Sequence, residues 1–272
     1  MAYFDPAEFL RPIAHRGLHD HRQGRIENTA PAFLAAIEHG LGIECDIRPA
    51  AGGLPVVFHD DSTERLLDEH LPVTALTQAD LCRLRYRDQS SSILRYGEIL
   101  ELVAGRTPLL VEIKSDWEEP DLTFLDEVVR LSCGYSGPLA LMSFDPPVMS
   151  RVRARAPDLA RGLVVTGMRP GDPLTRKLGL RRIFKLSQLL EAEPVAPDFY
   201  ACNVSDLMCY AISYARKVRG LPVFAWTVRT AEEYEAARRW ADAPIFEGPV
   251  IGELLVPALA KTLPSGQRLL KP

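Results

Sequence analysis

Short apolar runs in the first half of the chain each end in side chains that can hold a charge or move a proton. These are two histidines, three carboxylates, one arginine and one lysine, in the order His15, Arg16, Glu44, Asp46, His59, Glu112 and Lys114. If the apolar runs are strands of one sheet or barrel, their ends meet at a single mouth. Imidazoles, carboxylates and cations together suit metal-assisted chemistry on a phosphate ester.

Glu44 and Asp46 are two residues apart, so on a strand their side chains leave the same face. Two buried carboxylates without a cation would cost several kcal/mol, and a salt bridge to a buried lysine or arginine is one solution. Glu112, at the end of the next main strand, adds a third carboxylate, which exceeds what one basic partner can neutralise. Three such oxygen ligands predict a site for one divalent metal ion, Mg²⁺ or Ca²⁺.

His15 and His59 each end an apolar run, which directs both imidazoles toward the same carboxylates. Two imidazoles beside a phosphodiester can act as general acid and general base near neutral pH. Lys114 should share the face of Glu112, where it either meets a phosphate oxygen or forms an ion pair with Glu112. Arg16 either forks onto the same phosphate or lies exposed in its loop.

Apolar runs alternate with helix-like stretches along most of the chain, which predicts a parallel sheet with helical connections. Eight such units predict a (β/α)8 TIM barrel, and a doubly wound open sheet is the alternative. The last unit is expected to end in a helix near Leu263. The expected strands are 12–15, 42–47, 109–113, 138–143, 161–165, 199–203, 222–228 and 244–246, with a further extended piece at 55–58.

The interval between the second and third main strands is much longer than an ordinary connection. It holds short helical patterns at 78–84 and 96–103, separated by turn signals. We interpret residues of approximately 60–108 as an insertion that covers the strand ends of a single domain spanning 1–272.

The composition is that of an ordinary globular protein, with 47% hydrophobic and 25% charged residues. A formal net charge of −4 argues against a nucleic-acid-binding protein, which needs a basic surface. The five cysteines are dispersed and contain no C-x-x-C pair, which fits a reducing compartment. The first residues lack a signal-peptide pattern and no apolar run is long enough to span a bilayer. We therefore expect a soluble, cytoplasmic protein with no stable membrane association.

Taken in order, the motifs resemble those of the glycerophosphodiester phosphodiesterase family. The resemblance covers most of the chain and is densest in its first half. The matching motifs are His15-Arg16-Gly17, Glu27-Asn28-Thr29, Glu44-x-Asp46, His59-Asp60, Glu112-x-Lys114 and Trp226-Thr227.

The resemblance implies a TIM barrel with a small insertion, and metal-dependent hydrolysis of glycerophosphodiesters to sn-glycerol 3-phosphate and an alcohol at the C-terminal mouth. It makes His15 and His59 the acid/base pair. Glu27 and Trp226 are expected to shape the substrate pocket, although Trp226 could equally pack in the barrel core. The other implied roles are metal ligation by Glu44, Asp46 and Glu112, and phosphate binding by Arg16 and Lys114.

Two stretches depart from the family pattern. Residues 19–25 are polar and basic rather than a short Gly-rich link, and 243–248 read Ala-Pro-Ile-Phe-Glu-Gly instead of a Gly-Ile/Val-Ile-Thr-Asp pattern. Both leave the alcohol specificity open. The alternatives are a lysophospholipase D or sphingomyelinase D-like enzyme acting on lipids, and a non-catalytic phosphate-ligand binding protein. The expected partner is a small molecule, and the oligomeric state is left open.

Overall fold

The computed structural model describes residues 5–88, 90–167, 169, 171–248 and 255. Eight parallel strands close into a barrel, because β1 pairs with both β2 and β9. This confirms the predicted TIM barrel and excludes the open doubly wound sheet. The barrel strands are β1 (Ile13–Ala14), β2 (Gly42–Pro49), β4 (Leu109–Ile113), β5 (Leu139–Ser143), β6 (Arg161–Val165), β7 (Phe199–Asn203), β8 (Val223–Val228) and β9 (Ala243–Phe246).

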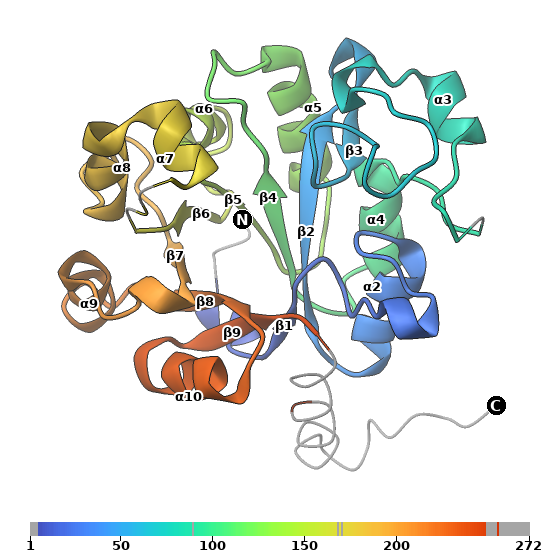
Figure 1. Cartoon of the computed structure of the whole chain (residues 1–272). Coiled ribbons are helices and arrows are strands. Elements are labelled where there is room, and N and C mark those ends of the chain that lie inside the picture. The colour runs from blue at the N-terminus through green and yellow to red at the C-terminus, as the bar shows by residue number, and fades with distance from the viewer. Residues whose placement is uncertain (1–4, 89, 168, 170, 249–254, 256–272) are drawn as a thin grey trace.

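Helices cover the outside of the barrel (Figure 1). Capping side chains fix where several of them begin; Asp121, for example, accepts hydrogen bonds from the backbone N–H groups of Thr123 and Phe124. The helices are α1 (Pro6–Phe9), α2 (Ala30–Glu38), α3 (Gln78–Arg83), α4 (Tyr96–Val103), α5 (Leu122–Cys133), α6 (Pro146–Arg155), α7 (Pro173–Leu178), α8 (Leu180–Ser187), α9 (Tyr210–Lys217) and α10 (Ala231–Trp240).

The alternation of side chains along each strand builds two apolar layers. In β4, Leu109, Val111 and Ile113 pack outward in the cluster shared with the helices, whereas Leu110 belongs to the cluster inside the barrel. Glu112 has the same parity as Leu110, so it also faces the interior, one layer nearer the carboxyl end of the strand. The lower barrel is therefore closed by apolar side chains, and on β4 a carboxylate lies in its upper part.

The long interval after β2 forms a unit with a hydrophobic cluster of its own, which includes Phe58, Leu67 and Tyr86. It contains β3 (Pro55–Val57), which pairs antiparallel with β2, and the short helix α3. By contrast, α4 contacts α2 and α5 and completes the outer ring of helices. We propose that the chain is one domain and that the inserted unit ends before α4.

The expected final helix, ending near Leu263, lies outside the described residues apart from Leu255. Within the described ranges, every helix is too short or too polar to cross a lipid bilayer.

Candidate active site

Three carboxylates from two neighbouring strands meet inside the upper barrel. Glu44 and Asp46 leave the same face of β2, and Asp46 is in register with Glu112 of β4. One oxygen of each of the three side chains lies within 4.8 Å of the others, and all three residues are buried. Glu44 Oε1 has no hydrogen-bond partner among the described residues. The donor set and this unpartnered oxygen fit a hard divalent cation.

Two cations from the predicted set contact this cluster directly. Lys114 Nζ lies 2.5 Å from Glu112 Oε1 and 2.8 Å from Asp46 Oδ1, so Lys114 does form the ion pair with Glu112. Arg16 Nε lies 3.2 Å from Asp46 Oδ2, and its backbone N–H donates to Glu44 Oε2 at 3.0 Å. Arg16 is thus mostly buried at the site, with a left-handed backbone (φ 55°).

The neighbouring charges shift the pKa values of the two carboxylates of β2 in opposite directions. Burial and the charges of Asp46 and Glu112 raise the pKa of Glu44 well above its ordinary value. Burial would also raise the pKa of Asp46, but Lys114 and Arg16 hold it well below that value. The pKa of Lys114 is raised despite burial, because Asp46 and Glu112 stabilise its charged form. The site therefore carries more carboxylate than its own cations neutralise.

His15 is held by a residue that the sequence alone did not single out. The Nδ1 atom of His15 lies 2.5 Å from Glu247 Oε2, directly after β9. The opposite ring nitrogen, Nε2, lies 3.9 Å from Glu44 Oε2. Glu247 also lies near His19 Nε2 (3.6 Å) and Arg229 Nε (2.6 Å). Burial lowers the pKa of His15, although the bond to Glu247 acts in the opposite direction. The ring is thus fixed with Nε2 toward the carboxylates.

His59 has an equivalent support from its neighbour in sequence. Its Nδ1 lies 2.6 Å from Asp60 Oδ1, and Asp60 Oδ2 accepts from Arg65 Nε at 2.6 Å. His59 also contributes to lowering the pKa of Asp46. Both predicted histidines therefore place Nδ1 against a carboxylate, which leaves Nε2 of each ring for other contacts.

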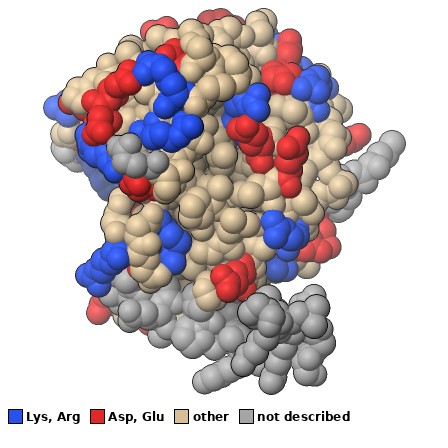
Figure 2. Space-filling view, turned by 90° about the vertical axis from the view of Figure 1, so that its right-hand side faces the viewer, with Lys and Arg blue, Asp and Glu red and all other residues tan. Residues whose placement is uncertain are grey.

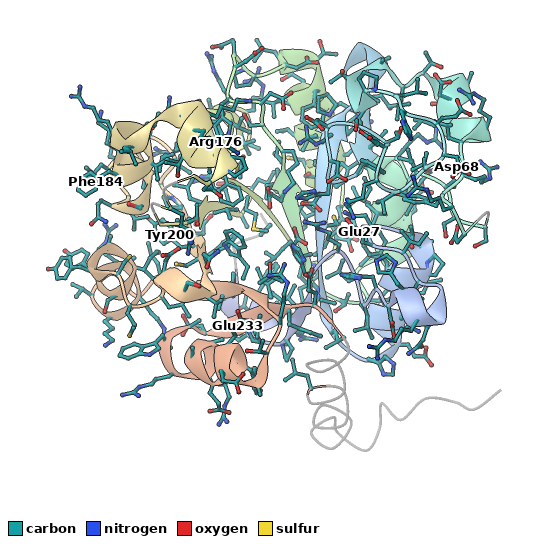
Figure 3. All side chains as sticks on the ribbon, in the orientation of Figure 1. Glu27, Asp68, Arg176, Phe184, Tyr200 and Glu233 are labelled. Carbon is teal, nitrogen blue, oxygen red and sulfur yellow. The ribbon has the colours of Figure 1, made fainter. Side chains whose placement is uncertain are left out.

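Glu27 links Arg16 to the inserted unit, and it lies beside β2 (Figure 3). One of its oxygens accepts from Arg16 at 2.7 Å, and Arg65 of the insertion forks onto both oxygens at 2.7 and 2.8 Å. Burial is outweighed by these two guanidinium groups, which lower the pKa of Glu27 to about 2. Glu27 therefore lies outside the acidic cluster, between the guanidinium groups of Arg16 and Arg65.

Asn28 is a second residue whose contacts the sequence did not reveal. Its side-chain amide donates to Asp46 Oδ2 at 2.9 Å, and its amide oxygen accepts from the backbone N–H of Asp46 at 3.3 Å. Asn28 has a positive φ of 56°, a conformation that asparagine tolerates better than most residues. Its place in the Glu27-Asn28-Thr29 motif was the available signal.

Trp226 lies on the apolar side of the barrel interior, away from the carboxylates. Its ring meets Phe144 edge-to-face at 5.4 Å, and its indole N–H donates to the carbonyl of Ala201 at 2.9 Å. Trp226 is only partly buried, so one part of the ring packs on the core cluster and another part stays accessible. It belongs to the lining of the barrel. Within the described residues it makes no contact with the ionic cluster.

A cavity of about 480 Å³ borders the ionic cluster at Lys114. It lies between the inserted unit, which contributes Gly53 and Thr74, and the loop after β4, which contributes Ser115. A larger cavity of about 670 Å³ is lined by Leu190 and Tyr214 and lies outside the barrel. Of the residues of the candidate site, Lys114 lines the smaller cavity.

A family model described as the glycerophosphoryl diester phosphodiesterase family matches residues 15–246. The chain belongs to this family. Among its relatives, glycerophosphodiester phosphodiesterase of Caldanaerobacter subterraneus subsp. tengcongensis is 26% identical, covering 82% of this chain and 87% of that protein. Glycerophosphodiester phosphodiesterase 1 of Bos taurus is 23% identical, covering 86% and 76%.

Solved structures of phosphodiesterases share the fold of this family member. A glycerophosphodiester phosphodiesterase from Thermotoga maritima is 24% identical with a TM-score of 0.66, covering 87% of this chain and 93% of that one. An Oleispira antarctica phosphodiesterase, solved with the product sn-glycerol-3-phosphate, is 20% identical with a TM-score of 0.69, covering 93% and 97%.

Proposed function

We propose that this family member hydrolyses small glycerophosphodiesters to sn-glycerol 3-phosphate and an alcohol, with one divalent metal ion and two histidines. The observation that carries the proposal is the buried cluster of Glu44, Asp46 and Glu112, with His15 Nε2 directed at it. The family membership supplies the substrate class. The proposed compartment is the cytoplasm.

Glu44, Asp46 and Glu112 would hold the metal, either Mg²⁺ or Ca²⁺, since carboxylate oxygens suit both ions. A bound divalent ion would neutralise the excess carboxylate and polarise a phosphate oxygen. The unpartnered Glu44 Oε1 supports this assignment, because a buried carboxylate oxygen without a donor is costly in the absence of a cation.

His15 and His59 divide the proton transfers. One imidazole takes the proton of the nucleophile, which is water or the glycerol 2-hydroxyl, and the other gives a proton to the departing alcohol oxygen. Attack by the 2-hydroxyl would form a cyclic phosphate, which water then opens to sn-glycerol 3-phosphate. Glu247 and Asp60 hold the two Nδ1 atoms and so orient both rings. Each Nε2 then carries or accepts the mobile proton on the side of the substrate.

Arg16 and Lys114 bind the phosphate. Both already lie against Asp46, so each can contact an anion beside the cluster with a small movement of its side chain. A guanidinium and an ammonium favour the developing negative charge without a proton of their own being transferred.

An assay of purified chain on glycerophosphocholine, with glycerol 3-phosphate as the measured product, tests the proposal. EDTA should abolish turnover, and Mg²⁺ or Ca²⁺ should restore it. Glu112→Gln should lose metal-dependent activity, whereas Glu38→Gln, which changes an exposed carboxylate of α2, should keep it.

Turnover that is indifferent to EDTA would remove the metal from the proposal. Binding of glycerophosphocholine without product release, even with metal supplied, would favour a binding protein instead. Preferential hydrolysis of lysophosphatidylcholine over glycerophosphocholine would assign the chain to the lipid-directed enzymes.

A further inference from the structure

A short segment after β6 has a charge opposite to that of the whole chain. Residues 173–190, PLTRKLGLRRIFKLSQLL, contain five Lys or Arg residues and no Asp or Glu, whereas the formal net charge of the protein is −4. Leucine, isoleucine and phenylalanine are interleaved with the cations. A basic segment of this composition is typical of surfaces that bind anionic partners.

The two helices of this segment leave apolar side chains exposed. Ile183 and Ser187 of α8 are buried, whereas Leu180 and Phe184, one helical turn apart, are 59% and 48% exposed. Leu190, just after α8, is 64% exposed. One face of α8 is therefore anchored, and the apolar residues of the other face have no cover among the described residues.

The cations beside these apolar residues are also unpaired within the described ranges. Arg182 is the exception, since it contacts Glu191 at 3.1 Å and lies over the ring of Trp117. The other four cations are exposed and make no ion pair among the described residues. They are Arg176, Lys177, Arg181 and Lys185.

The opposite side of the molecule is arranged differently. Around α3 and α4, basic and acidic side chains are interspersed (Figure 2). Arg83 pairs with Glu69 and Asp80, and Arg95 pairs with Glu98. Exposed arginines of this protein thus commonly have a carboxylate partner, whereas four cations of the α7–α8 segment have none among the described residues.

The segment lies at the same end of the barrel as the candidate active site. It follows the carboxyl end of β6, and Arg182 stacks on Trp117 in the loop that follows the carboxyl end of β4. Figure 3 labels Arg176 on α7 and Phe184 on α8. A surface that bound here would face the rim of the mouth.

We propose that α7 and α8 form a docking surface for anionic membranes. Unpaired cations would meet lipid phosphates, while Leu180 and Phe184 would enter the interfacial region between the headgroups. The combination favours a lipid surface, because cations interleaved with protruding apolar side chains match a charged layer above an apolar one. Docking is reversible and depends on charge, so it differs from the stable membrane association that the sequence disfavours.

Co-sedimentation of the full chain with lipid vesicles tests the proposal. The wild type should pellet with vesicles made of equal parts of phosphatidylcholine and phosphatidylglycerol, should be released by added salt, and should stay in solution with phosphatidylcholine alone. Arg181→Glu with Lys185→Glu should lower the bound fraction by at least ~10-fold. Phe184→Ser should lower it about 5-fold.

The matched control is Arg106→Glu with Lys217→Glu, which makes the same change of charge at exposed positions that precede β4 and β8, at the other end of the barrel. It should bind like the wild type. Hydrolysis of dissolved glycerophosphocholine should be equal in the wild type and in the Arg181/Lys185 variant, which separates a docking defect from a failure of the proposed activity.

Three results would overturn the proposal. The first is that the wild type stays in solution with both vesicle types. The second is that it binds both types equally, and the third is that it binds no better than the Arg181/Lys185 variant. Retention on an acidic polypeptide that is insensitive to Phe184→Ser, with no vesicle binding, would assign the surface to an acidic protein instead.

Discussion

The interior of the upper barrel has two unlike sides. The side built by β1, β2, β4 and β9 is ionic, whereas the side built by β5 to β8 is apolar. The ionic side consists of His15, Glu44, Asp46, Glu112, Lys114 and Glu247. The apolar side consists of Met142, Phe144, Val164, Ala201 and Trp226.

The two sides differ in how strictly they depend on each residue. On the ionic side most groups contact an opposite charge, so the loss of one partner leaves another charge buried and uncompensated. On the apolar side the constraint is mainly volume, and a change of similar size is tolerated. The difference suggests that catalysis depends on the first side and the fit of the organic part of the substrate on the second.

The largest expected effect is on the ionic side. His15→Ala or His59→Ala should lower kcat by at least ~10²-fold, because each removes a proton donor or acceptor from the reaction. Steady-state kinetics on glycerophosphocholine with saturating metal measure this. His39→Ala, which changes an exposed histidine after α2, is the control. Near-full activity of either variant would refute the assigned roles.

The pH dependence of stability should also distinguish the two sides. Since the pKa of Glu27 falls from 4.5 to about 2 on folding, its ion pairs contribute stability above about pH 4.5 that is lost as the pH falls toward 2. On acidification, the free energy of unfolding of Glu27→Gln should therefore fall by about 2 kcal/mol less than that of the wild type. Urea unfolding at several pH values between pH 6 and pH 3 measures this difference in the free energy of unfolding.

Phe144→Leu serves as the comparison for Glu27→Gln, because it changes the apolar side alone. It should lower the free energy of unfolding by the same amount at each pH. A Glu27→Gln protein whose stability follows the pH curve of the wild type would show that Glu27 does not carry this dependence.

A smaller effect is expected for the residue that positions His15. Glu247→Gln should lower kcat about 10-fold and leave KM nearly unchanged, because the orientation of the imidazole is weakened while the phosphate contacts remain. Glu247→Asp should recover part of the rate. If Glu247→Gln raised KM and kept kcat, Glu247 would be a substrate contact instead.

The smallest effect is expected on the apolar side. Trp226→Ala should raise KM about 3-fold for substrates with a bulky alcohol and change kcat little, because it removes packing area and leaves the ionic groups in place. A panel of glycerophosphodiesters with alcohols of different size measures this. A loss of kcat as large as that of the histidine variants would erase the distinction between the two sides.

Much of the barrel could be predicted from the sequence, because short apolar runs bounded by turn signals mark the strands. The meeting of Glu44, Asp46 and Glu112 followed from the same-face rule and from the adjacency of consecutive barrel strands. Their role as metal ligands stays a prediction. The membership of α4 in the outer ring was not apparent, since its pattern resembles that of the inserted helices.

The support of His15 could not be predicted. Glu247 and His15 are 232 positions apart and meet because β9 closes the barrel against β1. The position of Glu247 was visible only as a departure from the family pattern. Likewise, the fork of Arg65 onto Glu27 depends on how the inserted unit folds back, which no local periodicity encodes.

That fork has a consequence for how the chain could change by recombination. Two cations pair with Glu27: Arg65 comes from the inserted unit and Arg16 from the barrel. In a chimera whose inserted unit lacks an equivalent guanidinium, Glu27 would keep only Arg16 as a cationic partner. Exchange of the inserted unit between homologues should therefore succeed only when the residue at position 27 is exchanged together with it.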